Sequence, residues 1–239
     1  MKKTGIILGL ALLLTLPVSC LNDRDDYVDV RPTGLVTVYP DKEHGFKMQL
    51  DDKTVLYPTN VKTSPYKDKV VRALVNFTED NSSSTRPGTT TADEQLIKRN
   101  VKVNWMDSIR TKTPVKTVGE SDKLVYGGEP LEIVRDWVTV AEDGFITLRI
   151  RTAVGPFHQP HVINLVSGTN PEDPFEFVLR HDPRGDFGNQ LGDGLIAFNL
   201  NGMPHEGDEV KVTLNWTSFS GPKKLQFTLK MHKLSLIHI

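Results

Sequence analysis

Hydrophobic and polar residues alternate along the first half of the chain in short runs separated by turn residues. Phe46, Met48 and Leu50 lie at every second position, which is the pattern of a strand with one buried face. The turn residues Asp51–Lys53 lead into the next run. The alternation predicts about five strands in roughly 85 residues, namely Val36–Val38, Phe46–Leu50, Thr54–Pro58, Lys69–Phe77 and Lys98–Asp107. This number suits a small closed barrel of the OB type, which we assign to residues 34–118.

The same two-residue period returns near Leu131. Ile146, Leu148 and Ile150 lie on one face, and later runs repeat the scheme at Phe175–Leu179, Ile196–Leu200, Val210–Trp216 and Leu225–Met231. Six or more strands at a spacing of about 10 to 15 residues indicate an antiparallel β-sandwich, which we assign to residues 119–233. No long segment has a helical period. The predicted fold class is therefore all-β, an N-terminal OB-like barrel followed by a C-terminal sandwich, with Val115–Glu129 as the connection.

The first 20 residues have the features of an export signal. Lys2 and Lys3 precede the apolar run Gly5–Leu16, whose length of about 12 residues is well below the roughly 20 that span a bilayer. The run ends at Leu16-Pro17-Val18-Ser19-Cys20, which resembles a bacterial lipobox with Pro17 in place of the usual leucine. We predict a lipoprotein signal peptide at residues 1–19 and acylation of Cys20, for example with palmitate, whose chains would anchor the protein in a membrane. An ordinary signal peptide is the alternative.

The segment after Cys20 is acidic. Residues 20–33 contain Asn22-Asp23-Arg24-Asp25-Asp26, which resembles the surface-export tags of Bacteroidetes lipoproteins, although charged linkers also extend themselves without such a role. We expect a lipid-anchored outer-membrane protein, with the periplasmic and cell-surface faces both open.

The last six residues, 234–239, read Leu-Ser-Leu-Ile-His-Ile. They match the in-frame translation of a common sequencing adapter, so we treat them as an artefact and exclude them from the fold. The alternative is a genuine edge strand, since the segment is apolar and partly β-branched.

Composition narrows the function classes. The chain has 239 residues, of which 38% are hydrophobic and 25% charged, with one cysteine and a formal net charge of −1. These values exclude a disordered polymer and a disulfide scaffold. Nucleic acid is not an expected partner, because binding it normally requires a basic excess.

Several segments resemble a known family. The strand Phe46-Lys47-Met48-Gln49-Leu50 before Asp51-Asp52, and Val101–Trp105 followed by Asp107–Lys112, are similar to the NigD-like lipoproteins of Bacteroidetes. Leu179–Asp182, Gly185-Asp186 and Leu195–Phe198 are similar to the second domain of that family. The resemblance implies an OB-like domain followed by a β-sandwich. It also implies a possible bacteriocin-immunity role, although kinship at the level of the fold does not transfer function.

The sequence lacks the usual catalytic signatures. It has no Gly-x-Ser-x-Gly elbow and no glycine-rich phosphate loop, and the only thiol is assigned to lipid. We therefore predict a protein that is not an enzyme and binds no cofactor. His158 and His161 are a weak zinc candidate, because Pro156 and Pro160 exclude a regular helix and favour a turn.

Two further sites are candidates. Asp182, Asp186 and Asp193 lie among glycines, so their oxygens are candidates for a cation-binding loop, with a solvated hairpin as the alternative. Ser108 lies in Asp107-Ser108-Ile109, which matches the acceptor pattern of Bacteroidetes O-glycosylation.

Two function classes remain. The first is a non-enzymatic lipoprotein that binds an unknown protein or glycan. The second is a glycan-acting hydrolase or carbohydrate-binding protein. The hydrolase would use Asp182 and Asp186 as its carboxyl pair. A glycan-binding surface would need exposed aromatic rings, whereas Trp105, Trp137 and Trp216 lie on strand patterns and are expected in the core.

Overall fold

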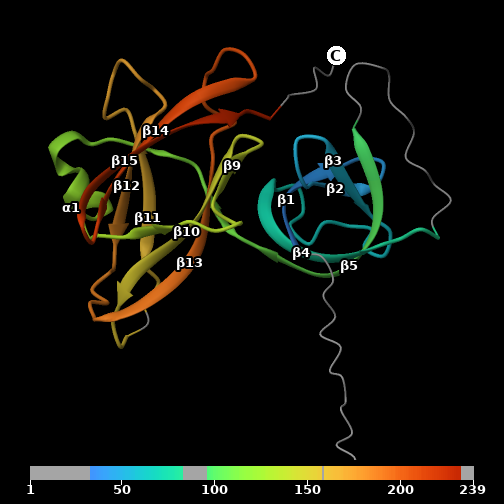
Figure 1. Cartoon of the computed structure of the whole chain (residues 1–239), viewed down its shortest axis with the longest axis horizontal. Coiled ribbons are helices and arrows are strands. Elements are labelled where there is room, and N and C mark those ends of the chain that lie inside the picture. Colours follow the sequence, from blue (N-terminus) through green and yellow to red (C-terminus); the bar gives the residue numbers. More distant parts are fainter. Residues whose placement is uncertain (1–32, 83–95, 158, 233–239) are drawn as a thin grey trace, which may run out of the picture. The chain divides into compact units, whose positions relative to one another are not determined.

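The computed structural model of the chain describes residues 33–82, 96–157 and 159–232. Five strands of the N-terminal half close into a barrel in the order β1-β2-β3-β5-β4 (Figure 1). Their bounds are β1 (Thr33–Asp41), β2 (Gly45–Gln49), β3 (Thr54–Pro58), β4 (Val71–Glu79) and β5 (Ile97–Ser108). All neighbouring pairs are antiparallel except β3 and β5, which are parallel. The predicted OB-type barrel is thus confirmed.

Local chemistry fixes the hairpin between β2 and β3. The Asp51 carboxylate accepts hydrogen bonds from the backbone N–H groups of Lys53 and Thr54, both at 2.8 Å, which closes the turn where the sequence predicted one. The inward side of each strand then fills the barrel with apolar side chains, namely Val36, Val38, Phe46, Met48, Leu56, Ala73, Val75, Phe77, Val101 and Val103. The alternation in the sequence is therefore the alternation between the barrel core and the outside.

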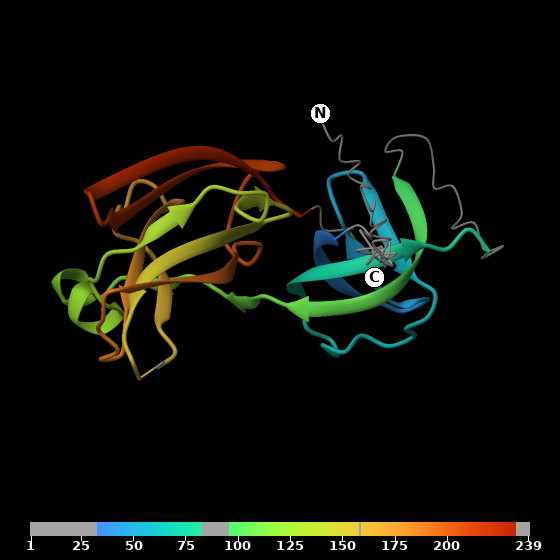
Figure 2. The ribbon, with the colours of Figure 1, turned by 60° about the horizontal axis from the view of Figure 1, so that its bottom comes forward.

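The C-terminal half is a sandwich of two sheets, as predicted, although each sheet contains parallel as well as antiparallel strand pairs. The first has the order β6-β13-β10-β8 with β9 also paired to β10, and the second has the order β15-β14-β12-β11-β7. The first comprises β6 (Arg110–Lys112), β8 (Glu132–Val134), β9 (Val140–Glu142), β10 (Phe145–Val154) and β13 (Gln190–Asn199). The second comprises β7 (Val115–Lys116), β11 (Val162–Ser167), β12 (Glu176–Asp182), β14 (Glu209–Ser218) and β15 (Gly221–Lys230). Figure 2 shows β14 and β15 as one long hairpin.

The inner faces of the two sheets form a single apolar core. Ile146, Leu148 and Ile150 of β10 are buried there, as the sequence predicted, with Phe177 and Leu179 of β12 in the same cluster. Helix is scarce. The connection contains a 3-10 turn, η1 (Gly119–Ser121), and α1 (Asp122–Tyr126). Among helices in the described part of the chain, none has the length and apolar character of a membrane span.

The domain border differs from the sequence assignment. Residues 110–116, which we assigned to the barrel, form β6 and β7, and these strands pair in parallel with β13 and β11 of the sandwich. Three-residue and two-residue strands are too short for alternation to be recognised, and their partners lie far along the chain. The barrel therefore ends near Ser108 rather than at residue 118.

Barrel and sandwich belong to one compact unit. A buried arginine of β4, Arg72, contributes to their contact and is 1% exposed. Its guanidinium donates to Thr37 Oγ1 at 2.8 Å within the barrel, and to Thr147 Oγ1 at 3.2 Å and Glu142 Oε1 at 2.5 Å in the sandwich. The charge is thus paired and hydrogen-bonded, which burial requires.

Candidate binding pocket

A pocket opens between the two sheets because one strand lacks side chains where they would fill the core. On β13 the inward positions that precede Ile196 are Gly194 and Gly192, which lie opposite Ile150 and Thr152 of β10. A Cβ atom added at Gly194 would meet nothing within 4 Å. This open space is part of a cavity of about 350 Å³, within the range of small-ligand sites.

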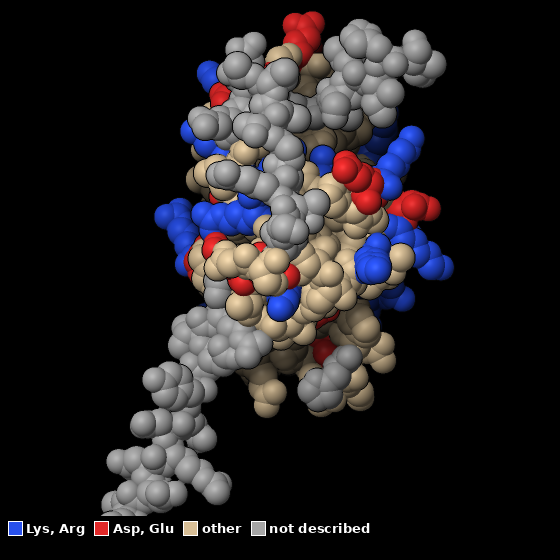
Figure 3. Space-filling model, turned by 90° about the vertical axis from the view of Figure 1, so that its right-hand side faces the viewer, with Lys and Arg blue, Asp and Glu red and all other residues tan. Residues whose placement is uncertain are grey.

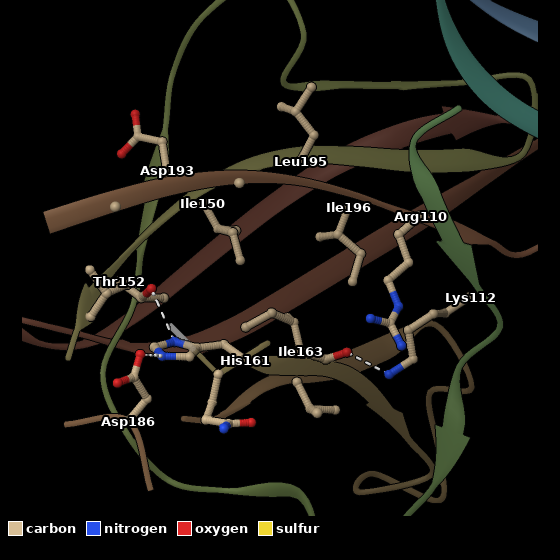
Figure 4. Close-up of a pocket in the computed structure, with 15 residues that line it drawn as sticks. Arg110, Lys112, Ile150, Thr152, His161, Ile163, Asp186, Asp193, Leu195 and Ile196 are labelled. Carbon is tan, nitrogen blue, oxygen red and sulfur yellow. Dashed lines mark hydrogen bonds and ion pairs between the residues drawn. The ribbon is translucent and has the colours of Figure 1, made fainter. Parts of the chain in front are cut away.

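The walls of the pocket are apolar and one end is basic. Ile150, Ile163 and Ile196 line its middle (Figure 4). Edge strand β6 places Arg110 opposite Ile196, and Lys112 lies on the same side of β6, so both reach the pocket. The polar residues of β6 thus lie at positions where a sandwich strand would normally carry apolar ones.

The two basic side chains differ in their hydrogen bonding. Lys112 Nζ donates to the carbonyl oxygen of Ile163 at 2.7 Å and to the side-chain oxygen of Asn164. Burial and the neighbouring Arg110 lower the pKa of Lys112. Among the residues drawn in Figure 4, the Arg110 guanidinium has no hydrogen-bond partner. Arg110 and the third N–H of Lys112 are therefore the donors at this end of the pocket.

The other end of the pocket contains a buried carboxylate. Asp186 is 1% exposed, and its Oδ1 atom accepts the backbone N–H of Phe157 at 2.9 Å. Its Oδ2 atom lies 3.6 Å from His161 Nε2, which is too long for a hydrogen bond. Within the described residues, neither of these two buried atoms has a hydrogen-bond partner. The two atoms are buried against each other, so the carboxylate and the ring form a close ionic contact at this end of the pocket.

A hydrogen-bonded pair of rings orients His161. His181 Nδ1 lies 3.1 Å from the carbonyl oxygen of Pro130, which can only accept, so this nitrogen carries the proton. His181 Nε2 then accepts from His161 Nδ1 at 2.9 Å. The network therefore places a proton on His161 Nδ1, and the Nε2 side of the ring faces the Asp186 carboxylate (Figure 4). Burial lowers the pKa of His181, which favours the neutral ring that this assignment needs.

A glycine allows the two loops at this end to approach closely. A Cβ atom at Gly155 would lie 2.4 Å from Asp186 Oδ1 and 2.5 Å from the carbonyl oxygen of Phe187. Any other residue would push these loops apart and break the bond from Phe157 to Asp186. The acidic end of the pocket thus depends on Gly155 as well as on its polar residues.

The three carboxylates of the predicted cation loop have separate partners. Asp182 accepts the backbone N–H of Arg184 at 2.8 Å, and Asp186 faces the pocket. Asp193 binds Arg151 and Arg149, which lower its pKa to about 2. Among the described residues, no group of three or more His, Cys, Asp or Glu side chains stands close enough to hold a metal ion. The cation site has no support from this arrangement.

Other predicted sites lie elsewhere or outside the described residues. Ser108 is exposed at the end of β5, where a glycan would have access, and its modification stays a prediction. Cys20, His158 and residues 234–239 lie outside the described part of the chain.

The expectation for the tryptophans was wrong for two of them. Trp105 and Trp137 are 47% and 60% exposed, and only the third, Trp216, packs against the sandwich core.

Sequence reasoning missed most of the pocket. Arg110, Lys112 and His181 were not singled out, and His161 was considered only with His158. Two signals were present in the sequence. Glycines at alternate positions of a strand leave a gap on one face, and a histidine in phase with Phe177 and Leu179 is directed inward.

Two family models match the chain in succession. The description NigD-like N-terminal OB domain applies to residues 35–109, and NigD-like C-terminal beta sandwich domain applies to residues 113–229. The chain belongs to the NigD-like family. The NigD-like resemblance predicted from the sequence is thereby confirmed, together with the order of the two domains.

Solved structures share this NigD-like fold. A Parabacteroides distasonis protein whose description suggests a relation to a toxin has 27% identity and a TM-score of 0.64, over 83% of this chain and 93% of that one. A NigD-like immunity protein from Bacteroides caccae has 14% identity and a TM-score of 0.55, over 84% and 97%. A Bacteroides fragilis protein whose description suggests a lipoprotein has 15% identity and a TM-score of 0.51, over 86% and 99%. The last two show the fold alone. No match was found among curated proteins.

Proposed function

We propose that the protein is a lipid-anchored outer-membrane binding protein without enzymatic activity, and that the pocket of its sandwich domain receives the ligand. The observation that carries this proposal is the cavity of about 350 Å³ beside Gly194, where an added Cβ would meet nothing within 4 Å. Its lining combines apolar side chains with the basic groups of Arg110 and Lys112. Apolar walls with a few convergent polar groups are typical of small-ligand sites.

The carboxylates favour binding over glycan hydrolysis. A glycosidase needs a general acid whose pKa is raised and a second carboxylate across the cleft. Asp193, the other carboxylate of the pocket, is held ionised by two arginines, with a pKa of about 2. Asp182, which we considered as the partner of Asp186, is bonded to the backbone of its own turn. Neither residue therefore suits the role of the acid.

The family relation supports an immunity-type role in particular. In this role the protein would capture a toxin or a fragment of one at the outer membrane before it reaches its target. The support is membership of the NigD-like family; the NigD-like immunity protein from Bacteroides caccae shares its fold. On the face shown in Figure 3, Lys and Arg side chains are spread out with Asp and Glu side chains among them. This mixed charge does not favour nucleic acid as the partner of that face.

The anchor rests on the sequence of residues 1–20 and is tested separately from the pocket. We expect metabolic labelling with a palmitate analogue to mark the wild type and to be lost in Cys20→Ala. Protease treatment of intact cells then distinguishes the cell surface from the periplasm. Equal labelling of the two proteins would contradict the anchor.

The pocket is tested by filling it. Gly194→Leu adds a side chain where the structure has space, and Gly202→Leu is the matched control, because a Cβ there also meets nothing within 4 Å and lies outside the pocket. Residues 20–239 carrying Cys20→Ala would be heated with fractionated cell-envelope extract. A ligand that binds the folded protein raises the melting temperature.

We expect stabilisation of the parent protein and of Gly202→Leu, and none of Gly194→Leu. Equal stabilisation of all three, or of none, would contradict a ligand in the pocket. Turnover of a glycan in the extract that disappears in Asp186→Asn would instead establish the hydrolase.

A further inference from the structure

The charges at the two ends of the pocket differ in whether they are already paired. The Asp186 carboxylate lies against His161 and accepts the backbone N–H of Phe157. Among the residues drawn in Figure 4, no carboxylate pairs with Arg110 or Lys112 at the opposite end. Resting on the proposed binding function, we infer that the ligand is a free fatty acid of medium chain length. Its carboxylate would bind at the basic end, and its chain would lie along the isoleucines.

The basic end selects an anion. Arg110 and Lys112 lie two residues apart on β6, and both side chains are directed to this end of the pocket (Figure 4). Burial and the neighbouring Arg110 lower the pKa of Lys112, so the two positive charges repel each other and an anion between them would relieve the repulsion. A carboxylate matches the parallel N–H groups of a guanidinium. Lys112 adds the donor that remains after its bonds to Ile163 and Asn164.

Two incompletely paired strands give the ligand access from the side of the sandwich. β6 pairs with β13 at Ile196–Phe198 alone, and β7 pairs with β11 at Val166 and Ser167 alone. In the described part of the chain, the rest of each outer edge has no partner strand. Residues 192–195 of β13 and 162–163 of β11 belong to these free edges and line the pocket. A flexible chain can therefore enter between the two edges without displacing a strand.

The middle of the pocket favours an aliphatic chain over a sugar acid. The isoleucine side chains there are almost fully buried and offer no hydrogen bond. The uncharged polar side chains of the lining belong to the far end, since Thr152 contacts His161 and Gln159 precedes that histidine by two residues. A sugar hydroxyl beside the isoleucines would lose its hydration without gaining a side-chain partner, whereas methylene groups are stabilised by leaving water.

The dimensions of the pocket set the length of the chain. A volume of about 350 Å³ equals about twelve times the roughly 30 Å³ that a water molecule occupies in the liquid. A methylene group is of similar size, so a carboxylate with about ten carbon atoms fits. Gly192 and Ile196, both in the lining, are four residues apart on β13, which corresponds to about 13 Å. Ten carbon atoms in an extended chain span about 11 Å, because each bond of about 1.5 Å advances the chain by about 1.3 Å. Decanoate is therefore a suitable probe.

Isothermal titration of residues 20–239 carrying Cys20→Ala would compare decanoate with hexanoate and with the neutral 1-decanol. We expect decanoate to bind and 1-decanol to bind at least tenfold more weakly, because it lacks the charge. Hexanoate should bind more weakly than decanoate by up to about fourfold for each methylene removed.

Variants at the two parts of the site distinguish the head group from the chain. Arg110→Gln should weaken decanoate binding about tenfold and leave 1-decanol binding unchanged. Arg135→Gln, at an exposed arginine outside the pocket, is the matched control and should change neither. Gly194→Leu should abolish the binding of decanoate, whereas Gly202→Leu should retain it.

The outcomes separate this inference from the proposed function. If envelope extract stabilises the protein in a manner that Gly194→Leu abolishes, while neither fatty acid binds, the fatty-acid inference is wrong and the pocket is still a binding site. Equal binding of decanoate and 1-decanol would overturn it, as would decanoate binding that Gly194→Leu leaves unchanged. The peptide acetyl-Leu-Val also has a free carboxylate, and its backbone suits the free edge of β13. Tighter binding of this peptide than of decanoate would assign the pocket to peptides instead.

Discussion

The buried ring of His181 makes the stability of the protein depend on pH. This side chain is 2% exposed at the end of an apolar row on β12, and burial lowers its pKa below the ordinary value of 6.5. The folded protein therefore binds fewer protons than the unfolded chain as the pH falls below about 6.5. Stability attributable to His181 is complete above that pH and is lost as the pH falls towards the pKa of the folded state.

The size of the effect follows from proton linkage. One proton taken up by the unfolded chain alone changes the free energy of unfolding by up to about 1.4 kcal/mol per pH unit. Integration from pH 7.5 to pH 5.5 gives an upper limit of about 1.4 kcal/mol for one histidine with an unfolded pKa of about 6.5. In His181→Phe the titrating group is absent, so this component vanishes. The variant also loses the bonds to Pro130 and His161, which costs about 1 to 3 kcal/mol at every pH.

Urea unfolding at pH 5.5, 6.5 and 7.5 measures the free energy of unfolding of both proteins. Tryptophan fluorescence is a suitable signal because Trp216 packs against the sandwich core. We expect the advantage of the wild type over His181→Phe to shrink by about 1 kcal/mol from pH 7.5 to 5.5. His205→Gln, at a half-buried turn histidine outside the pocket, is the control. A difference between wild type and His181→Phe that stays constant across this range would refute the reasoning.

Three further predictions concern other parts of the chain. Arg72→Met should lower the free energy of unfolding by about 3 to 5 kcal/mol, because it leaves the partly buried carboxylate of Glu142 without its cationic partner. Burial already raises the pKa of Glu142, so the loss measured by urea unfolding should be smaller at pH 4 than at pH 7, where the carboxylate must be charged. Ser108→Ala should lower the intact mass of the protein from its native host by a glycan; an unchanged glycan mass would exclude modification there. Deleting residues 234–239 should change the free energy of unfolding by less than about 1 kcal/mol, as measured by thermal unfolding. A loss of several kcal/mol would show that the segment is a true strand.

The positions of the longer strands could be predicted from the sequence, because alternation is a local property. Phe46, Met48 and Leu50 are directed to one side of their strand wherever it lies, so the barrel and the sandwich could both be predicted. The turn at Asp51 was equally local, since its carboxylate bonds to the next residues along the chain. The short strands β6 and β7 could not be predicted, because they are defined by partner strands some 50 to 85 residues away along the chain.

The pocket was decided by the tertiary structure. Asp186, His161 and His181 meet through the pairing of β11 with β12 and the contact of two loops at Gly155, none of which has a spacing that sequence alone reveals. In the sequence, Asp193 and Asp186 are equivalent candidates for a site. In the structure, β13 places Asp193 beside two arginines and places the neighbouring Gly194 at the pocket. Alternation tells which residues share a face. Only the register between strands determines what that face meets, and so which polar atoms remain for a ligand.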